Sequence, residues 1–100
     1  MGFRHVALFK LKPTTTDEQR QALIDHLRGL ATEIDSVRSL SVGADAQLAD
    51  DNYECVLVAD FDDEPGYLVY RDHPLHVSVI EQYVRPVMAA RAAIQYTLIP

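Results

Sequence analysis

The sequence has only one cysteine, Cys55, so it cannot form an internal disulfide bond. No apolar run approaches the ~20 residues that a membrane-spanning helix needs. The amino-terminal stretch MGFRHVALFK is not arranged as a signal peptide, because charged residues interrupt its apolar part. These absences predict a cytoplasmic protein that has no membrane partner.

Positive charge is scarce as well. Nine lysines and arginines are outnumbered by 15 aspartates and glutamates, which gives a net charge of −6, and the basic residues are scattered along the chain. Because nucleic-acid binding needs clustered basic side chains to neutralise phosphates, no nucleic-acid partner is expected. The chain also lacks a glycine-rich phosphate loop and a recognisable Ser-His-Asp arrangement.

What remains is typical of a single folded domain over residues 1–100. The hydrophobic pattern predicts strands at 3–12, 37–46, 53–61 and 91–99. A helix is expected to begin after Thr16, because Thr16 and Gln19 have the spacing of a capping box. A second helical region is expected from residue 62 onward, interrupted by Pro74 and Pro86.

This order of elements, βαββαβ, predicts an α+β, ferredoxin-like fold. Such a fold has a four-stranded antiparallel sheet with both helical regions on one face. Each helical region carries an apolar stripe for packing on the sheet: Leu23, Leu27, Leu30 and Ile34 in the first, and Val77, Ile80, Val84 and Val87 in the second.

The strands are apolar on both of their faces. In the first strand Val6 and Leu8 alternate with Ala7 and Phe9. A sheet that is exposed to water on one side instead alternates polar and apolar residues. Because no further helix is available to cover the second face, the sequence predicts a homodimer that packs sheet against sheet.

The segment YRDHPLH, residues 70–76, contains the side chains best suited to chemistry. Pro74 breaks the helix between Tyr70 and His76, which lets these two side chains converge. His5 lies on the strand face assigned to the helices, so the three rings are expected to meet between the sheet and the helical layer. A neutral imidazole there can take up a proton near pH 7, and a tyrosine hydroxyl can stabilise a carbonyl oxygen or an enolate.

Each of these residues also has a simpler structural interpretation. His73 precedes a proline and is better suited to be a helix cap or a surface residue than a catalyst. His5 taken alone is typical of a buried core histidine, and Tyr70 of ordinary helix packing. The H-x-x-H spacing of His73 and His76 has no nearby third ligand, so neither a metal site nor a cofactor is predicted.

Five stretches together resemble one protein family. RHVALFKLK, SVGAD, LVADFDD, YRDHPLH and YVRPV look like, in the same order, the corresponding parts of the Dabb family of stress-responsive dimeric α/β-barrel proteins. The resemblance spans nearly the whole chain, and HVxLFK and HPxH are its most specific parts. It implies two ferredoxin-like protomers that close a dimeric α/β barrel between their sheets.

The resemblance also implies a chemistry. Some plant members of the family are polyketide cyclases, which close an aromatic ring by aldol chemistry without a cofactor. Their base is the second histidine of HPxH, which matches His76, and it acts with the tyrosine that matches Tyr70; His5 matches a pocket histidine. Those cyclases have a further pocket tyrosine where this chain has Leu27, which cannot donate a hydrogen bond, so a different substrate is expected.

Two functional hypotheses follow. In the first, the dimer binds a small organic ligand between sheet and helices, with His76 as the base of a cyclase or lyase, Tyr70 and His5 as its catalytic partners, and a pocket formed by Ala7, Phe9, Leu23, Leu27 and Ile80. In the second, the chain is a non-enzymatic stress-responsive or structural dimer, and the three polar rings form a closed core network. An open cavity of ~300 Å³ or more favours the first hypothesis. An oxygenase-like protein is a third option, but it needs a haem, a quinol-like substrate or a metal that nothing in the sequence indicates.

Overall fold

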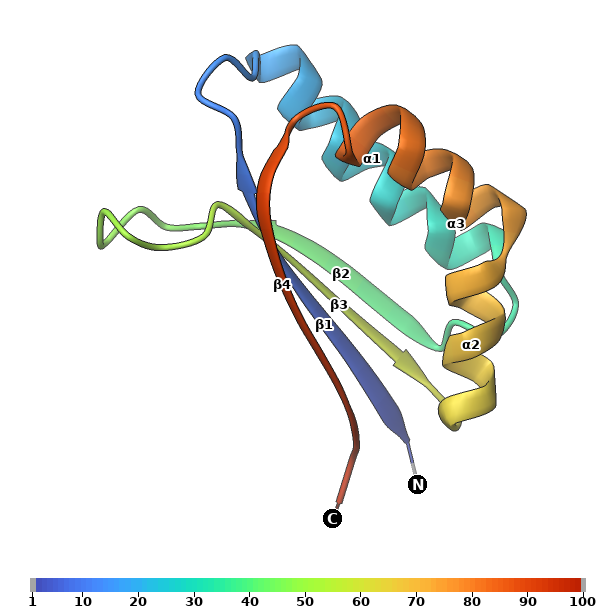
Figure 1. The fold of residues 1–100 in the computed structure, drawn as a ribbon. Coiled ribbons are helices and arrows are strands. Elements are labelled where there is room, and N and C mark those ends of the chain that lie inside the picture. The colour runs from blue at the N-terminus through green and yellow to red at the C-terminus, as the bar shows by residue number, and fades with distance from the viewer. Residues whose placement is uncertain (1, 100) are drawn as a thin grey trace.

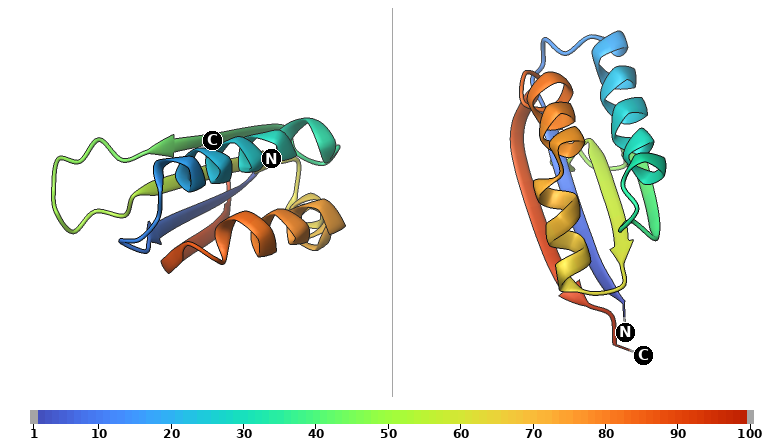
Figure 2. Two further views of the ribbon diagram at one scale, coloured as in Figure 1. Left: turned by 90° about the horizontal axis from the view of Figure 1, so that it is seen from above. Right: turned by 90° about the vertical axis from the view of Figure 1, so that its right-hand side faces the viewer.

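The structure of the chain, a computed structural model, describes residues 2–99. Its elements in chain order are β1 (Phe3–Leu11), α1 (Asp17–Glu33), β2 (Ser39–Ala44), β3 (Cys55–Phe61), α2 (Glu64–Asp72), α3 (Pro74–Val79), the π-helical segment η1 (Ile80–Val84) and β4 (Met88–Thr97). The strands form one antiparallel sheet in the order β2-β3-β1-β4. Figures 1 and 2 show α1 and the α2–α3 region on the same face of this sheet, so the predicted ferredoxin-like fold is confirmed.

The first helix begins where the capping box predicts. The Thr16 side chain accepts a hydrogen bond from the Gln19 backbone N–H at 3.1 Å, and the Gln19 side chain accepts one from the Thr16 N–H at 2.9 Å. These bonds satisfy backbone donors that a helix start leaves free. The predicted stripe of α1 is fully buried against the sheet: Leu23, Leu27, Leu30 and the C-cap residue Ile34. Within residues 2–99, no helix combines the length and hydropathy needed to cross a membrane.

The second helical stripe differs from the prediction at Val77, which is 48% exposed. The buried position of α3 is Val79, and the next is Val84, five residues later. The reason is the π-helical turn of η1, closed by a bond from the Arg85 N–H to the Ile80 carbonyl at 2.8 Å. A π turn holds an extra residue, so the buried positions depart from the 3.6-residue spacing of an α-helix.

The strand boundaries agree with the predictions to within a few residues. The largest difference is β4, which begins at Met88 rather than at residue 91. The pairing of β2 with β3 is in even register throughout, and the irregularity of the sheet lies between Lys10 and Leu11, where β1 pairs with β4.

The two faces of the sheet have different surroundings. The helix-facing side holds core residues such as Ala7, Phe9 and Leu57, each no more than 2% exposed. The opposite side has no covering element among residues 2–99, and Figure 1 shows it open. Its side chains are largely apolar: Val6, Leu8, Val56, Val58, Ile94 and Tyr96, joined by the Arg4–Asp60 ion pair at 2.7 Å. We call this side the open face.

Candidate functional site

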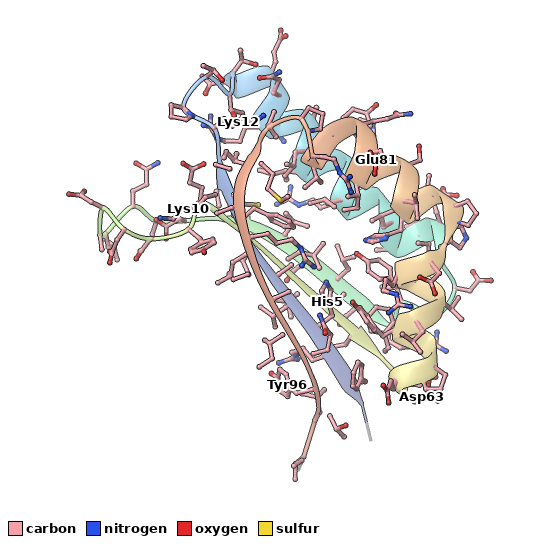
Figure 3. All side chains as sticks on the ribbon, in the orientation of Figure 1. His5, Lys10, Lys12, Asp63, Glu81 and Tyr96 are labelled. Atoms are coloured by element: carbon pink, nitrogen blue, oxygen red, sulfur yellow. The ribbon has the colours of Figure 1, made fainter. Side chains whose placement is uncertain are left out.

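A cavity of about 830 Å³ lies between the helix-facing side of the sheet and the α2–α3 region. Figure 3 shows His5 projecting from β1 toward the helices on this side. The cavity wall is formed by His5, Ala7, Phe9, Leu27, Leu57, Tyr67, Tyr70, Arg71, His76, Ile80, Val84, Arg85, Met88, Arg91, Ala93 and Gln95. Its volume is within the range of small-molecule sites, ~300–1,000 Å³.

His76 is placed in the cavity by the break at Pro74. It lies in the first turn of α3, and its Nδ1 is 2.9 Å from the carbonyl oxygen of Arg71 in the last turn of α2. A carbonyl oxygen only accepts, so Nδ1 carries the proton and donates it in this bond. Burial lowers the pKa of His76 below its usual value. At pH 7 the ring is therefore neutral, with an unprotonated Nε2 that can act as a base.

His5 has the opposite arrangement of donor and acceptor. It is 4% exposed, and its Nδ1 is 2.9 Å from the amide nitrogen of Gln95, its neighbour across the β1–β4 pairing. An amide NH₂ only donates, so Nδ1 of His5 accepts and Nε2 carries the proton. Burial, with a smaller effect from the charges of Arg91 and His76, lowers the pKa of His5 to about 4. His5 is thus a neutral hydrogen-bond donor at pH 7.

Tyr70 lies between the two imidazoles. Its ring centroid is 4.4 Å from that of His76 and 6.2 Å from that of His5, and the residue is only 1% exposed. Burial raises the pKa of the Tyr70 hydroxyl, so it remains protonated and able to donate. The structure therefore brings together the three residues that the sequence singled out, with one base and two donors among them.

Most of the predicted pocket residues line the cavity. Ala7, Phe9, Leu27 and Ile80 are part of its wall. Leu23 is not; it is fully buried in the core, one turn before Leu27 on α1. An apolar stripe indicates which side of a helix is buried, but the cavity occupies only the part of that side next to α3 and β4.

His73 is a helix cap. It ends α2 and begins α3, and its Nδ1 accepts a hydrogen bond from the Leu75 backbone N–H at 3.1 Å. This agrees with the structural interpretation of the residue, because a ring nitrogen that caps a helix is occupied by that bond.

Several polar residues of the cavity wall were not indicated by the sequence, and Arg91 and Gln95 are two of them. Both lie on β4, where they pair with Phe9 and His5 of β1. Their side chains consequently face the helical layer together with those of their partners. The sequence shows which residues of β4 are polar, but it does not show how β4 is aligned with β1. The paired residues His5 and Gln95 are 90 positions apart in the chain.

The cavity is suited to moving a proton between carbon and nitrogen. It is mainly apolar, with an acceptor nitrogen on His76 and donors on Tyr70 and His5. Residues 2–99 contain no group of three or more His, Cys, Asp or Glu side chains placed to hold a metal ion. A base and hydrogen-bond donors of this kind are the groups that catalyse enolisation of a carbonyl compound.

Comparison with known proteins adds the family. The sequence profile of the Stress responsive A/B Barrel Domain family, Dabb, matches residues 3–98. Curated proteins give no match. Among solved structures, a dimeric ferredoxin-like protein of unknown function from Thermobifida fusca is 39% identical, with a TM-score of 0.89 over 98% of this chain and 92% of that one.

Two more distant structures share the fold. A Dabb family protein with a ferredoxin-like fold from Mesorhizobium loti is 21% identical, with a TM-score of 0.83 over 99% of this chain and 98% of its own. A hydroxynitrile lyase from Passiflora edulis is 14% identical, with a TM-score of 0.88 over 98% of this chain and 94% of its own. At these identities the likeness concerns the fold.

Proposed function

The chain belongs to the stress-responsive A/B barrel family, Dabb, and from this premise we propose that it binds a small organic carbonyl compound in its cavity and transfers a proton from it without a cofactor. The reaction is of the lyase or cyclase type. His76 is the base, and Tyr70 and His5 are the donors to the substrate carbonyl oxygen.

One observation carries this proposal: His76 lines the cavity, and the bond from its Nδ1 to the Arg71 carbonyl leaves its Nε2 as an acceptor. In the reaction, Nε2 takes the proton from a carbon next to the substrate carbonyl. The electron pair of that C–H bond forms a C=C bond while the π pair of the carbonyl moves to its oxygen, where the Tyr70 hydroxyl and the Nε2–H of His5 stabilise the charge. The protonated His76 then returns its proton to the new alkoxide or to the leaving group. The resulting enolate attacks a second carbonyl, as in a cyclase, or expels a leaving group, as in a lyase.

The fold and the cavity volume support the proposal. The hydroxynitrile lyase from Passiflora edulis is an enzyme with the same fold, although its low identity does not carry its residues over to this chain. A non-enzymatic dimer, the alternative hypothesis, needs the three polar rings to be closed off by packing. The cavity of about 830 Å³ beside them favours ligand binding instead.

The proposal includes the assembly and the location of the protein. We propose that two copies pair through their open faces, supported by the apolar side chains there and by the dimeric description of the Thermobifida fusca protein. The two protomers then form the α/β barrel of the family, each folded as one domain. The single cysteine is consistent with a cytoplasmic location.

Deuterium exchange tests the base. The wild-type protein is expected to accelerate exchange of the hydrogens next to the ketone of 4-phenylbutan-2-one or 4-oxo-4-phenylbutanoate in D₂O, followed by ¹H NMR. The change His76→Gln should slow the catalysed exchange by about 10²-fold or more, because a positioned base contributes that much.

The matched control is His26→Gln, since His26 is an exposed histidine outside the cavity wall. This variant should exchange both ketones at the wild-type rate. The proposed function is contradicted if the wild-type protein exchanges both ketones no faster than buffer does. It is also contradicted if His76→Gln exchanges them at the wild-type rate.

A further inference from the structure

The cavity wall has a charge opposite to that of the whole chain. The protein carries 15 acidic and nine basic side chains, not counting histidine. Its cavity is nevertheless lined by three arginines, Arg71, Arg85 and Arg91, and by no aspartate or glutamate. An apolar cavity with cationic groups and no anionic ones attracts anions, because the low-dielectric walls concentrate the field inside it.

Two of the three arginines are already paired. Arg71 forms an ion pair with Asp72 at 2.9 Å, and Arg85 forms one with Glu81 at 3.0 Å. Both arginine side chains are more than half exposed, so they lie at the rim of the cavity. Arg91 is exposed as well, but it differs from them in its pairing: among residues 2–99 no carboxylate lies within 4.0 Å of its guanidinium. It is the unneutralised charge of the cavity wall.

Arg91 also lies close to the proposed reaction site. On β4 it is opposite Phe9, and its side chain is on the same side of the sheet as those of Gln95 and His5. Burial is the main cause of the low pKa of His5 and of the low pKa of His76, and the charge of Arg91 also lowers both. It opposes the effect of burial on the pKa of Tyr70. Its field therefore reaches all three residues.

We propose that Arg91 binds a carboxylate of the ligand, so that the substrate class of this cavity is a small keto acid with an apolar or aromatic body. The keto group of this substrate class rests on the proposed function. The carboxylate group rests on the charge of the cavity wall. The planar guanidinium fits a carboxylate with two parallel hydrogen bonds. The apolar wall, including Phe9, Leu27 and Ile80, holds the rest of the molecule.

Binding of a matched pair of probes tests this assignment without any turnover. The probes are 4-phenylbutanoate and 4-phenylbutanamide, which have the same shape and differ in charge. Titration calorimetry with the wild-type protein should give an affinity for the carboxylate about 10-fold or more above that for the amide, as expected for a charge-assisted bidentate contact. The preference should weaken at high salt.

The variant Arg91→Met should bind the carboxylate and the amide with about the same affinity, since it removes the charge and keeps most of the side-chain volume. Its affinity for the amide should stay at the wild-type value, which shows that the cavity is intact. The matched control Arg85→Met removes a cavity-wall arginine that is paired with Glu81 and should keep most of the preference. The inference is overturned if the wild-type protein binds both probes equally or does not bind the carboxylate. It is also overturned if Arg91→Met prefers the carboxylate over the amide as strongly as the wild-type protein does.

The same titration in His76→Gln separates the inference from the proposed function. A carboxylate preference that depends on Arg91 and persists in His76→Gln supports the inference even if no ketone undergoes exchange. Exchange that depends on His76, together with no preference for the carboxylate, rejects the anion site and leaves the base in place.

Discussion

Two histidines in one cavity have opposite hydrogen-bonding roles because their neighbours differ. A backbone carbonyl holds the proton on Nδ1 of His76, whereas the amide of Gln95 directs it to Nε2 of His5. The sequence indicated that these rings meet, and the break at Pro74 explains why. It did not indicate which ring accepts and which donates, because that depends on contacts from Arg71 and from β4.

The low pKa of His5 makes the stability of the protein depend on pH. His5 has a pKa of about 4 in the folded protein and 6.5 in its ordinary state, so the unfolded chain binds a proton more readily. This contribution is fully present above pH 6.5 and is lost as the pH falls toward 4. For one group with this shift the loss is at most about 3 kcal/mol of unfolding free energy.

Urea unfolding at pH 7 and at pH 4.5 measures this contribution. We expect His5→Gln to lose less stability between the two pH values than the wild-type protein does, because it lacks the buried imidazole. The exposed-histidine control His26→Gln should keep the wild-type dependence. An equal loss in His5→Gln and in the wild-type protein would show that His5 is not the group responsible.

At the scale of elements, the junction of α2 and α3 organises the site. His73 caps both helices, and Pro74 starts the second one, so the chain turns between them. The turn allows the His76 ring to reach the Arg71 carbonyl five residues earlier. In one continuous helix that carbonyl would instead accept a backbone N–H from the following turn.

The change Pro74→Ala permits the helix to continue through this junction, since alanine restores the backbone donor and removes the ring. We expect His76 to lose its bond to Arg71, and the deuterium exchange to fall by about 10²-fold, the contribution of a positioned base. The ¹⁵N chemical shifts of the His76 ring report which nitrogen carries the proton. Pro13→Ala, at an exposed loop position, is the control. Unchanged shifts and exchange in Pro74→Ala would mean that the break does not position the base.

Local signals in the sequence predicted the elements better than the contacts between them. The capping box at Thr16 and the proline at position 74 act on neighbouring residues, and both predictions are confirmed. The exposure of Val77 follows from the π-helical turn, which depends on how η1 packs. The sequence predicts Leu23 at the cavity and gives no sign of Arg91, because both placements depend on which distant element lies opposite.

At the scale of the whole molecule, the open face is the surface proposed to pair two copies. Ile94 is 59% exposed on β4 and belongs to this face. We expect Ile94→Glu to weaken the dimer, since it places a charge in an apolar contact. Analytical ultracentrifugation at micromolar concentration should give a wild-type mass twice the chain mass of 11.2 kDa and a lower average mass for the variant.

Val69 provides a matched control for this experiment. It is 56% exposed, similar to Ile94, but it lies on α2, away from the open face. Val69→Glu should therefore sediment as the wild-type protein does. A wild-type protein that sediments as a single chain at this concentration would reject the pairing.

The edge strand β4 contributes to two surfaces at once. Its inward side chains, Arg91, Ala93 and Gln95, form part of the cavity wall, and its outward side chains Ile94 and Tyr96 belong to the open face. Whatever steadies this strand from one side lowers the entropic cost of contacts made on the other. The proposed binding of a ligand in the cavity and the proposed pairing of the open faces are therefore expected to be thermodynamically linked, and by reciprocity each would strengthen the other to the same degree.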